Sequence, residues 1–122
     1  MGREIKFRGK DVAGEWHYGL LTVLPKSVRM LQKGSYISND AGLPFAYQVR
    51  PETVGQYTGL QDKNGREIYE GDILHWNIGF DMYSAVECQD GSFWSGETLL
   101  ADSLEEEVVG NIYENADLIA EV

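Results

Sequence analysis

Four carboxylates lie close together in the stretch Tyr57–Asp72, which reads YTGLQDKNGREIYEGD. They are Asp62, Glu67, Glu70 and Asp72. Carboxylates that converge on a divalent ion can activate water and clamp a phosphate ester. A metal-dependent hydrolase is therefore one hypothesis for this chain, and it requires these side chains to meet in one cleft.

A calcium-binding loop beginning at Asp62 is excluded by the spacing of the residues that follow. Such a loop needs an acidic or amide ligand at its fifth position, glycine at the sixth and glutamate at the twelfth. The residues at those positions are Arg66, Glu67 and Ile73. Because none of the three positions holds the required residue, we interpret the stretch first as a set of backbone turns.

Two turn types are open to Asn64-Gly65, and charge decides between them. A two-residue turn would place Lys63 opposite Arg66, and like charges directly opposite each other destabilise a hairpin. A type I turn with Gly65 in a left-handed bulge instead places Asp62 opposite Arg66, a pair of opposite charge. We therefore predict a bulged hairpin, with Leu60 opposite Ile68.

A second tight corner follows this hairpin. Gly71 can take a positive φ, and Asp72 can accept backbone N–H groups as the next strand begins. The predicted structural turn residues are Asp62, Asn64, Gly65 and Gly71. The carboxylates that the hairpin does not fully explain form the candidate surface of the chain: Glu67, Glu70 and Asp72.

The two histidines and the single cysteine are the other side chains that could take part in chemistry. His17 and His75 each adjoin a tryptophan and are expected to be half-buried strand residues. Cys88 alternates with polar neighbours and is expected to face the core as a small apolar group. No zinc-ligand spacing, catalytic triad motif or phosphate-binding glycine loop occurs in the sequence. We expect no cofactor, no metal and no catalytic residue, and lean against an enzyme.

Fourteen glycines and seven tyrosines favour short strands joined by turns. Residues 4–21 predict an N-terminal hairpin whose turn begins at Asp11, with Gly14 in the bulge position. Residues 22–47 contain Pro25, Pro44 and a glycine-bounded segment, and are expected to be a variable loop region. Residues 49–122 predict the β core. Its expected elements are strands at 54–60, 73–76, 83–88, 93–94 and 108–113, an Asp-Gly hairpin at 89–92, and a short helix at 116–121 capped by Asn115.

The 122 residues suit a single domain with its own core. One cysteine excludes an internal disulfide and fits a reducing compartment. The start MGREIKFRGK lacks the apolar segment of a signal peptide, and no apolar run reaches membrane-spanning length. We therefore expect a cytoplasmic protein without a membrane partner.

Charge is unevenly distributed along the chain. Residues 1–61 carry 8 basic and 5 acidic side chains, a net +3, whereas residues 62–122 carry 2 basic and 15 acidic side chains, a net −13. The excess of acidic side chains disfavours direct nucleic-acid binding, since phosphates are repelled. A dipolar chain can instead pair head-to-tail with its own copies.

The stretch PETVGQYTGLQDKNGREIYEGDIL, residues 51–74, resembles the signature of the YopX family. IKFRG at 5–9 and GEWHYG at 14–19 are similar to the start of that family, and VGNIYEN at 109–115 is similar to its end. The resemblance implies a small protein of a bacteriophage or prophage in a bacterial host. It also implies a mainly β fold, a pseudo-barrel of short antiparallel strands and hairpins, and it brings no established activity.

Three functional hypotheses remain open. The first is a non-enzymatic accessory protein that binds a host or phage protein, or forms a homo-oligomer. The second is an acidic DNA mimic that inhibits a host nucleic-acid-binding protein, which predicts one continuous carboxylate face. The third and least favoured is the metal-dependent hydrolase that uses Glu67, Glu70 or Asp72.

Overall fold

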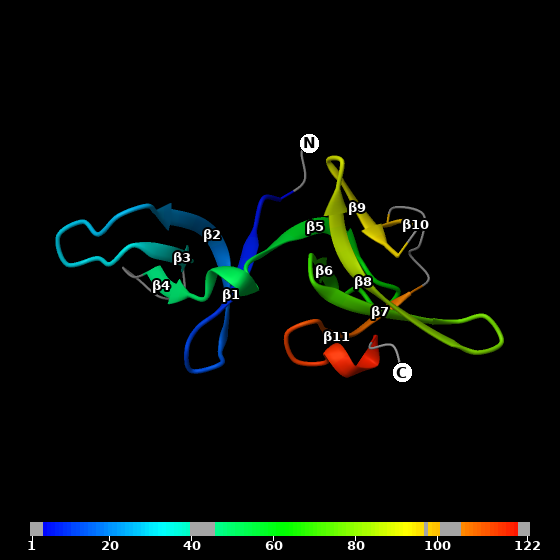
Figure 1. Cartoon of the computed structure of the whole chain (residues 1–122). Coiled ribbons are helices and arrows are strands. Elements are labelled where there is room, and N and C mark those ends of the chain that lie inside the picture. The colour runs from blue at the N-terminus through cyan, green and yellow to red at the C-terminus, as the bar shows by residue number, and fades with distance from the viewer. Residues whose placement is uncertain (1–3, 40–45, 97, 101–105, 120–122) are drawn as a thin grey trace. The chain divides into compact units, whose positions relative to one another are not determined.

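The computed structural model describes residues 4–39, 46–96, 98–100 and 106–119. Strands dominate the described residues, and each of them pairs antiparallel with a neighbouring strand (Figure 1). The contacts divide the chain into two compact units, Met1–Gln56 and Tyr57–Val122. The mainly β class predicted from the sequence is confirmed.

The N-terminal unit is built on a sheet in the order β4-β3-β2-β1. Its strands are β1 (Phe7–Lys10), β2 (Trp16–Leu24), β3 (Gly34–Ser38) and β4 (Ala46–Val49). The first residues of β5 (Gly55–Gln61) pair with β1 after a 3-10 turn, η2 (Pro51–Thr53). Ile37 of β3 and Val49 of β4 are buried, and a β-carbon at Gly9 would lie 2.7 Å from the Val49 side chain. Glycine at position 9 thus lets β1 pack closely beneath β4.

The predicted N-terminal hairpin is present. Asp11 N donates to Glu15 O, Gly14 N donates to Asp11 O at 3.1 Å, and Gly14 has φ +89°. The loop prediction for 22–47, in contrast, is wrong at residues 22–24, which end β2, and at residues 46–47, which begin β4. It is also wrong at Gly34–Ser38, which form β3, where Ser35, Tyr36 and Ile37 are buried. The run is too short to show a periodicity, and only its two sheet neighbours reveal it as a strand. Residues 40–45 lie outside the described residues.

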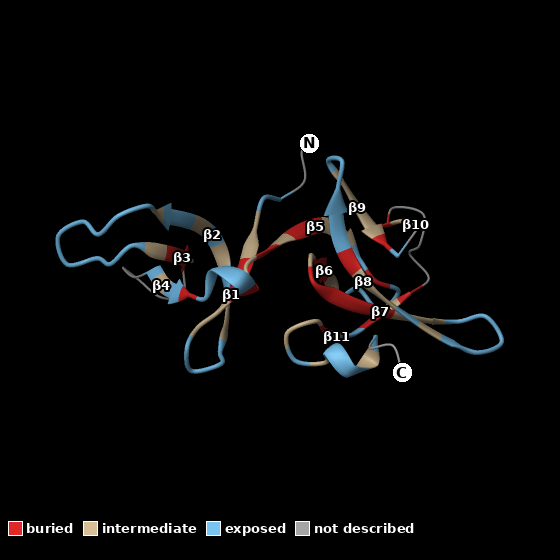
Figure 2. Cartoon of the chain, in the orientation of Figure 1, coloured by how far each residue is buried: buried red, intermediate tan, exposed pale blue. Residues whose placement is uncertain are grey.

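The C-terminal unit contains a five-stranded sheet in the order β10-β9-β8-β7-β11. Its strands are β7 (Asp72–Asn77), β8 (Asp81–Gln89), β9 (Ser92–Ser95), β10 (Thr98–Leu99) and β11 (Glu107–Asn111). The short strand β6 (Glu67–Tyr69) pairs with β5. Figure 2 shows buried residues along β6 and β7. The core cluster of this unit consists of Ile68, Leu74, Val86, Leu100 and Val108.

The bulged hairpin predicted between β5 and β6 is present. Gly65 N donates to Asp62 O, Asp62 N donates to Arg66 O, and Gly65 has φ +82°. Gln61 pairs with Glu67, which is the register that follows from Asp62 opposite Arg66, but the register then shifts and Tyr57 pairs with Tyr69. A bulge therefore interrupts the pairing expected for Leu60, which packs against the core cluster.

The Asp90-Gly91 hairpin between β8 and β9 is also confirmed. Both residues have positive φ, +53° and +78°, as a two-residue turn of this type requires. Cys88, close to that turn, is exposed, so the prediction that it faces the core is wrong. The reason is its position on the strand: Val86 is the buried apolar residue of β8, and Cys88 lies beyond it toward the hairpin tip.

The C-terminal predictions need three corrections. The last strand ends at Asn111, whose side-chain oxygen accepts the N–H groups of Tyr113 and Glu114 and turns the chain. A 3-10 turn, η4 (Ala116–Leu118), stands in the region of the expected helix 116–121, whose last residues are not among those described. Asn115 does not cap it, because its side chain instead accepts the N–H of Asn111.

Among the described residues both strand orders are open, with β4 and β6 at the ends of one order and β10 and β11 at the ends of the other. The described strands therefore do not form a closed barrel. Of the pseudo-barrel prediction, the antiparallel strands and hairpins are confirmed. No helix in the described part of the chain is long and apolar enough to cross a membrane.

Candidate functional site

Asp62, the first of the sequence-predicted residues, acts as a structural clamp. Its side chain is 6% exposed. Oδ1 accepts the N–H groups of Asn64 and Arg66, and Oδ2 accepts the N–H of Val108 at 2.9 Å. Burial acts to raise the pKa of Asp62, but these backbone donors outweigh it and hold the pKa below its ordinary 3.8. Both carboxylate oxygens of Asp62 thus accept hydrogen bonds from backbone N–H groups.

Asp72 is also structural. It is 2% exposed, and its Oδ2 accepts the N–H of Tyr69 at 2.7 Å across the corner that Gly71 forms with φ +94°. The corner geometry is the predicted one. The prediction that Asp72 lies on an accessible surface is wrong. Its carboxylate is buried because it accepts the N–H of the buried residue Tyr69.

Glu67 and Glu70 are half-buried. The hydroxyl of Tyr69 donates to Glu67 Oε1 at 3.0 Å. Within the described residues, the one group of three or more side chains whose ligand atoms gather closely enough for a metal lies elsewhere, in the N-terminal unit. The four carboxylates of the Tyr57–Asp72 stretch therefore do not form the convergent site that a hydrolase needs.

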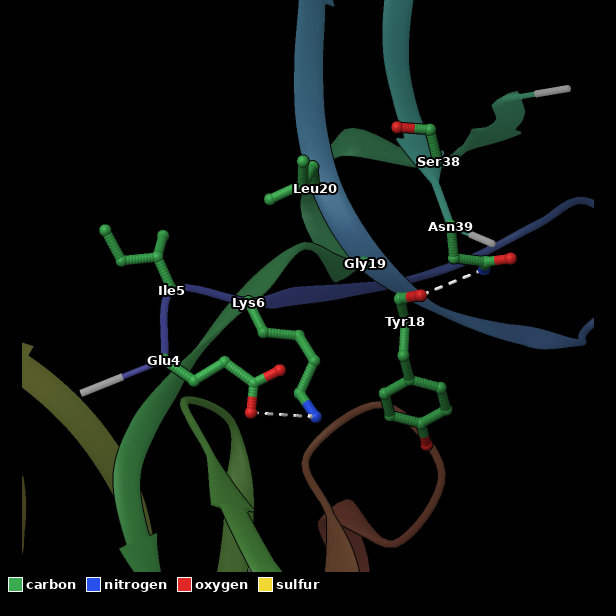
Figure 3. A pocket seen from close by; sticks show the side chains of 8 residues that line it. All are labelled: Glu4, Ile5, Lys6, Tyr18, Gly19, Leu20, Ser38 and Asn39. Carbon is green, nitrogen blue, oxygen red and sulfur yellow. Dashed lines mark hydrogen bonds and ion pairs between the residues drawn. The ribbon is translucent and has the colours of Figure 1, made fainter. Parts of the chain in front are cut away.

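An open hollow of about 300 Å³ lies on the N-terminal unit, and we refer to it as the N-terminal hollow. It is lined by Glu4, Ile5, Lys6, Tyr18, Gly19, Leu20, Ser38 and Asn39 (Figure 3). The lining comes from the segment before β1, the middle of β2 and the end of β3. Sequence reasoning missed it, because the three segments meet only once β3 pairs with β2.

Apolar side chains around this hollow are unusually open to solvent. The exposed fractions are 64% for Ile5, 44% for Tyr18 and 60% for Leu20. Lys6 Nζ lies 3.7 Å from Glu4 Oε1 at the same place. A hollow that combines exposed aliphatic and aromatic side chains with charged groups has the composition of a recognition surface.

Gly19 and Asn39 fix the backbone beneath the hollow. A β-carbon at Gly19 would overlap the carbonyl group of Ser38. Asn39 Nδ2 donates to the carbonyl oxygen of Tyr18 at 2.9 Å (Figure 3). The floor of the hollow is therefore a close approach of β2 and β3 that a side chain at position 19 would prevent.

Asp11, Glu15 and His17 form the group with metal-ligand proximity, on the β1–β2 hairpin. His17 Nε2 lies 2.8 Å from Asp11 Oδ2, and the His17 ring stacks on Tyr47 with centroids 4.0 Å apart. The hydrogen bond with His17, together with the N–H groups of Glu15 and Ala13, lowers the pKa of Asp11. His17 is half-buried on a strand, as the sequence predicts.

His75 of the C-terminal unit lies between two carboxylates. Its Nε2 is 2.9 Å from Asp81 Oδ1, and its Nδ1 is 3.4 Å from Glu107 Oε1. The hydrogen bond with Asp81 raises the pKa of His75; desolvation opposes this shift and the bond with Glu107 adds to it. These two partners come from β8 and β11, so three strands of the C-terminal unit contribute to the cluster.

Comparison with known proteins finds one family model and one solved structure that match nearly the whole chain, and one curated protein that matches part of it. The family model described as "YopX protein" matches residues 6–120. The crystal structure of protein EF1440 from Enterococcus faecalis aligns with a TM-score of 0.60 and 25% identity, over 98% of this chain and 100% of that chain. Receptor-like protein 1 of Arabidopsis thaliana is 31% identical over 83 residues, which are 68% of this chain and 7% of that protein. The chain thus spans a small fraction of the length of that curated relative.

Proposed function

Because the chain belongs to the YopX family, we propose that it is a small accessory protein of a bacteriophage or prophage that acts by binding rather than catalysis. Its proposed binding partner is a second copy of the same chain. The observation that carries this proposal is the N-terminal hollow with its exposed rim of Ile5, Tyr18 and Leu20. Burial of such side chains against a partner stabilises association by about 25 cal/mol per Å² of apolar surface.

The charge distribution favours a second copy as the occupant. Residues 1–61, which contain the hollow, carry a net +3, and residues 62–122 carry a net −13. Head-to-tail association brings the acidic part of one copy toward the basic part of the next, so opposite charges meet. The two ends of the contact then differ, and association builds rings or open chains rather than a symmetric pair.

The hydrolase hypothesis loses its support at the same time. Asp62 and Asp72 use their carboxylates to hold backbone N–H groups inside the fold. A metal-dependent hydrolase needs carboxylates that are available to an ion in one cleft. Binding is therefore the better interpretation of the accessible surface.

Light scattering coupled to size-exclusion chromatography tests the proposal. The average mass is expected to rise with protein concentration and to fall as salt is added, because salt screens the complementary charges. Leu20→Glu adds a negative charge to the hollow and is expected to shift the protein toward monomer. The matched control is Val12→Glu, which adds the same charge at a residue 88% exposed on the β1–β2 hairpin tip.

A monomeric mass at every concentration would contradict self-association. An equal effect of Leu20→Glu and Val12→Glu would contradict the N-terminal hollow as the contact surface. A monomer that instead competes with duplex DNA for a basic host protein, in a salt-sensitive manner, would support the acidic DNA mimic. The experiment therefore separates the two binding hypotheses.

A further inference from the structure

Three side chains of metal-binding type share one face of the β1–β2 hairpin. Asp11 N donates to Glu15 O, so these two residues lie opposite each other, and Gly9 pairs with His17. Opposite residues of an antiparallel pair lie on the same face, and alternate positions return to it. The hairpin register thus places Asp11, Glu15 and His17 together.

The lysine of the hairpin belongs to the other face. Lys10 pairs with Trp16, one position out of phase with His17, and its ammonium lies 5.8 Å from the centroid of the Trp16 ring. The face that carries the two carboxylates and the imidazole is therefore kept apart from this cation by the strand alternation.

The ligand atoms already have nearly the spacing of a coordination site. One ligand atom from each of the three side chains lies within 4.8 Å of the other two. Ligands of a tetrahedral Zn²⁺ site lie about 2.0–2.2 Å from the ion, and hence roughly 3.4 Å from each other. The 2.8 Å between His17 Nε2 and Asp11 Oδ2 must open only slightly to admit an ion.

The fold also fixes the orientation of two of the three ligands. Asp11 Oδ1 accepts the N–H groups of Ala13 and Glu15, both at 2.9 Å, which leaves Oδ2 directed toward His17. The imidazole is held by its stacking on Tyr47, with an interplanar angle of 11°. Contacts of this kind orient metal ligands and raise the affinity of a site.

We propose that Asp11, Glu15 and His17 bind one divalent transition-metal ion of the zinc class, with further coordination positions open to water or another ligand. An imidazole nitrogen with two carboxylates favours Zn²⁺, Cu²⁺ or Ni²⁺ over Mg²⁺ and Ca²⁺, which take oxygen ligands. His75 offers the informative contrast. Asp81 is next to Nε2 of the His75 ring and Glu107 is next to Nδ1. The two carboxylates therefore cannot bind the same ion together with one nitrogen of that ring.

Calorimetric titration of the full chain with Zn²⁺ alone tests the site, followed by a competition with Mg²⁺. One ion is expected to bind per chain, and excess Mg²⁺ is not expected to displace it. Glu15→Gln keeps the backbone N–H that Asp11 accepts, and Glu15 is exposed, so this variant is expected to fold normally. Glu15→Gln and His17→Gln should each weaken Zn²⁺ binding by at least about tenfold.

The matched control is His75→Gln, which removes the other histidine of the chain and should leave Zn²⁺ binding unchanged. The proposal is overturned if wild-type protein shows no Zn²⁺ binding. It is also overturned if Glu15→Gln and His17→Gln bind as wild type does, or if His75→Gln is the variant that loses binding. Equal displacement by Mg²⁺ would contradict the assigned class of metal.

Discussion

The carboxylate of Asp62 accepts the backbone N–H of Val108, 46 residues further along the chain, at 2.9 Å. Val108 lies on β11 and belongs to the core cluster of the C-terminal unit. The same carboxylate closes the β5–β6 turn through Asn64 and Arg66. One buried side chain therefore joins a local turn to a distant strand, and this explains its acidic identity better than catalysis does.

Replacing Asp62 by alanine is expected to lower the free energy of unfolding by about 2–4 kcal/mol, because a buried N–H is left without an acceptor and two turn bonds are lost. Urea denaturation followed by circular dichroism measures the change. Lys63→Ala is the control, since Lys63 is exposed in the same turn, and it is expected to change stability by less than about 0.5 kcal/mol. Equal losses for the two variants would refute the clamp.

His75 predicts a pH dependence of stability. Its pKa is raised above the ordinary 6.5 in the folded chain, first by Asp81 and also by Glu107. A raised folded pKa stabilises the fold fully below the unfolded pKa, and this contribution is lost as pH rises through the folded value. The melting temperature of wild type, minus that of His75→Gln, is therefore expected to shrink as pH rises above about 6.5.

Melting curves at several pH values measure this difference. Asp81→Asn removes the charge of the nearer carboxylate, and it should flatten the pH dependence while leaving Glu107 in place. Tyr83 also faces the ring, with centroids 5.0 Å apart, and its contact is kept in that variant. A pH-independent difference between wild type and His75→Gln would show that the two carboxylates do not act on this histidine.

The sequence predicted local turns better than it predicted contacts between residues far apart in the chain. The turns at Asp11–Gly14 and Asp62–Gly65 are decided by a few adjacent residues, so their geometry is legible locally. The partner of Asp62 on β11 depends on how distant strands pair, and no local pattern contains that information. The same limit hid β3, which is a strand because β2 and β4 pair with it.

The grouping of Asp11, Glu15 and His17 could be predicted in part from the sequence. The predicted hairpin, once its register is written out, already places Asp11, Glu15 and His17 on one face. The D-x3-E-x-H pattern of these residues does not match the linear ligand spacings of known zinc sites, so the motif alone does not indicate a metal. The N-terminal hollow, by contrast, required the pairing of β2 with β3 before it was visible.

Cys88 is expected to react with a thiol reagent in the native protein. Its thiol is exposed near the β8–β9 turn, so access does not require unfolding. Ellman's reagent measures the rate, and urea-unfolded protein serves as the reference. A native rate within about tenfold of the unfolded rate agrees with the exposed position. Protection by several orders of magnitude would place the thiol in the core, as the sequence alone suggested.

Gly19→Ala is expected to destabilise the N-terminal unit. The added β-carbon overlaps the Ser38 carbonyl group, so β2 and β3 must separate at a cost of about 1–3 kcal/mol beyond any backbone strain. Gly65→Ala is the matched control, because a β-carbon there meets nothing within 4 Å and only the positive φ of +82° is penalised, by about 1–2 kcal/mol. Urea denaturation of both variants compares the two costs, and a smaller loss for Gly19→Ala would contradict the close approach.

The single domain expected from the sequence stays a prediction that these variants test. Gly19 lies in the unit Met1–Gln56 and Asp62 in the unit Tyr57–Val122, with β5 continuing from one to the other. If residues 1–122 unfold as one cooperative domain, Gly19→Ala and Asp62→Ala must shift the same transition, whichever probe is used. Tryptophan fluorescence separates the alternatives, since Trp16 lies in the first unit and Trp76 and Trp94 lie in the second. Two transitions, with each substitution moving only one of them, would show that the units fold independently.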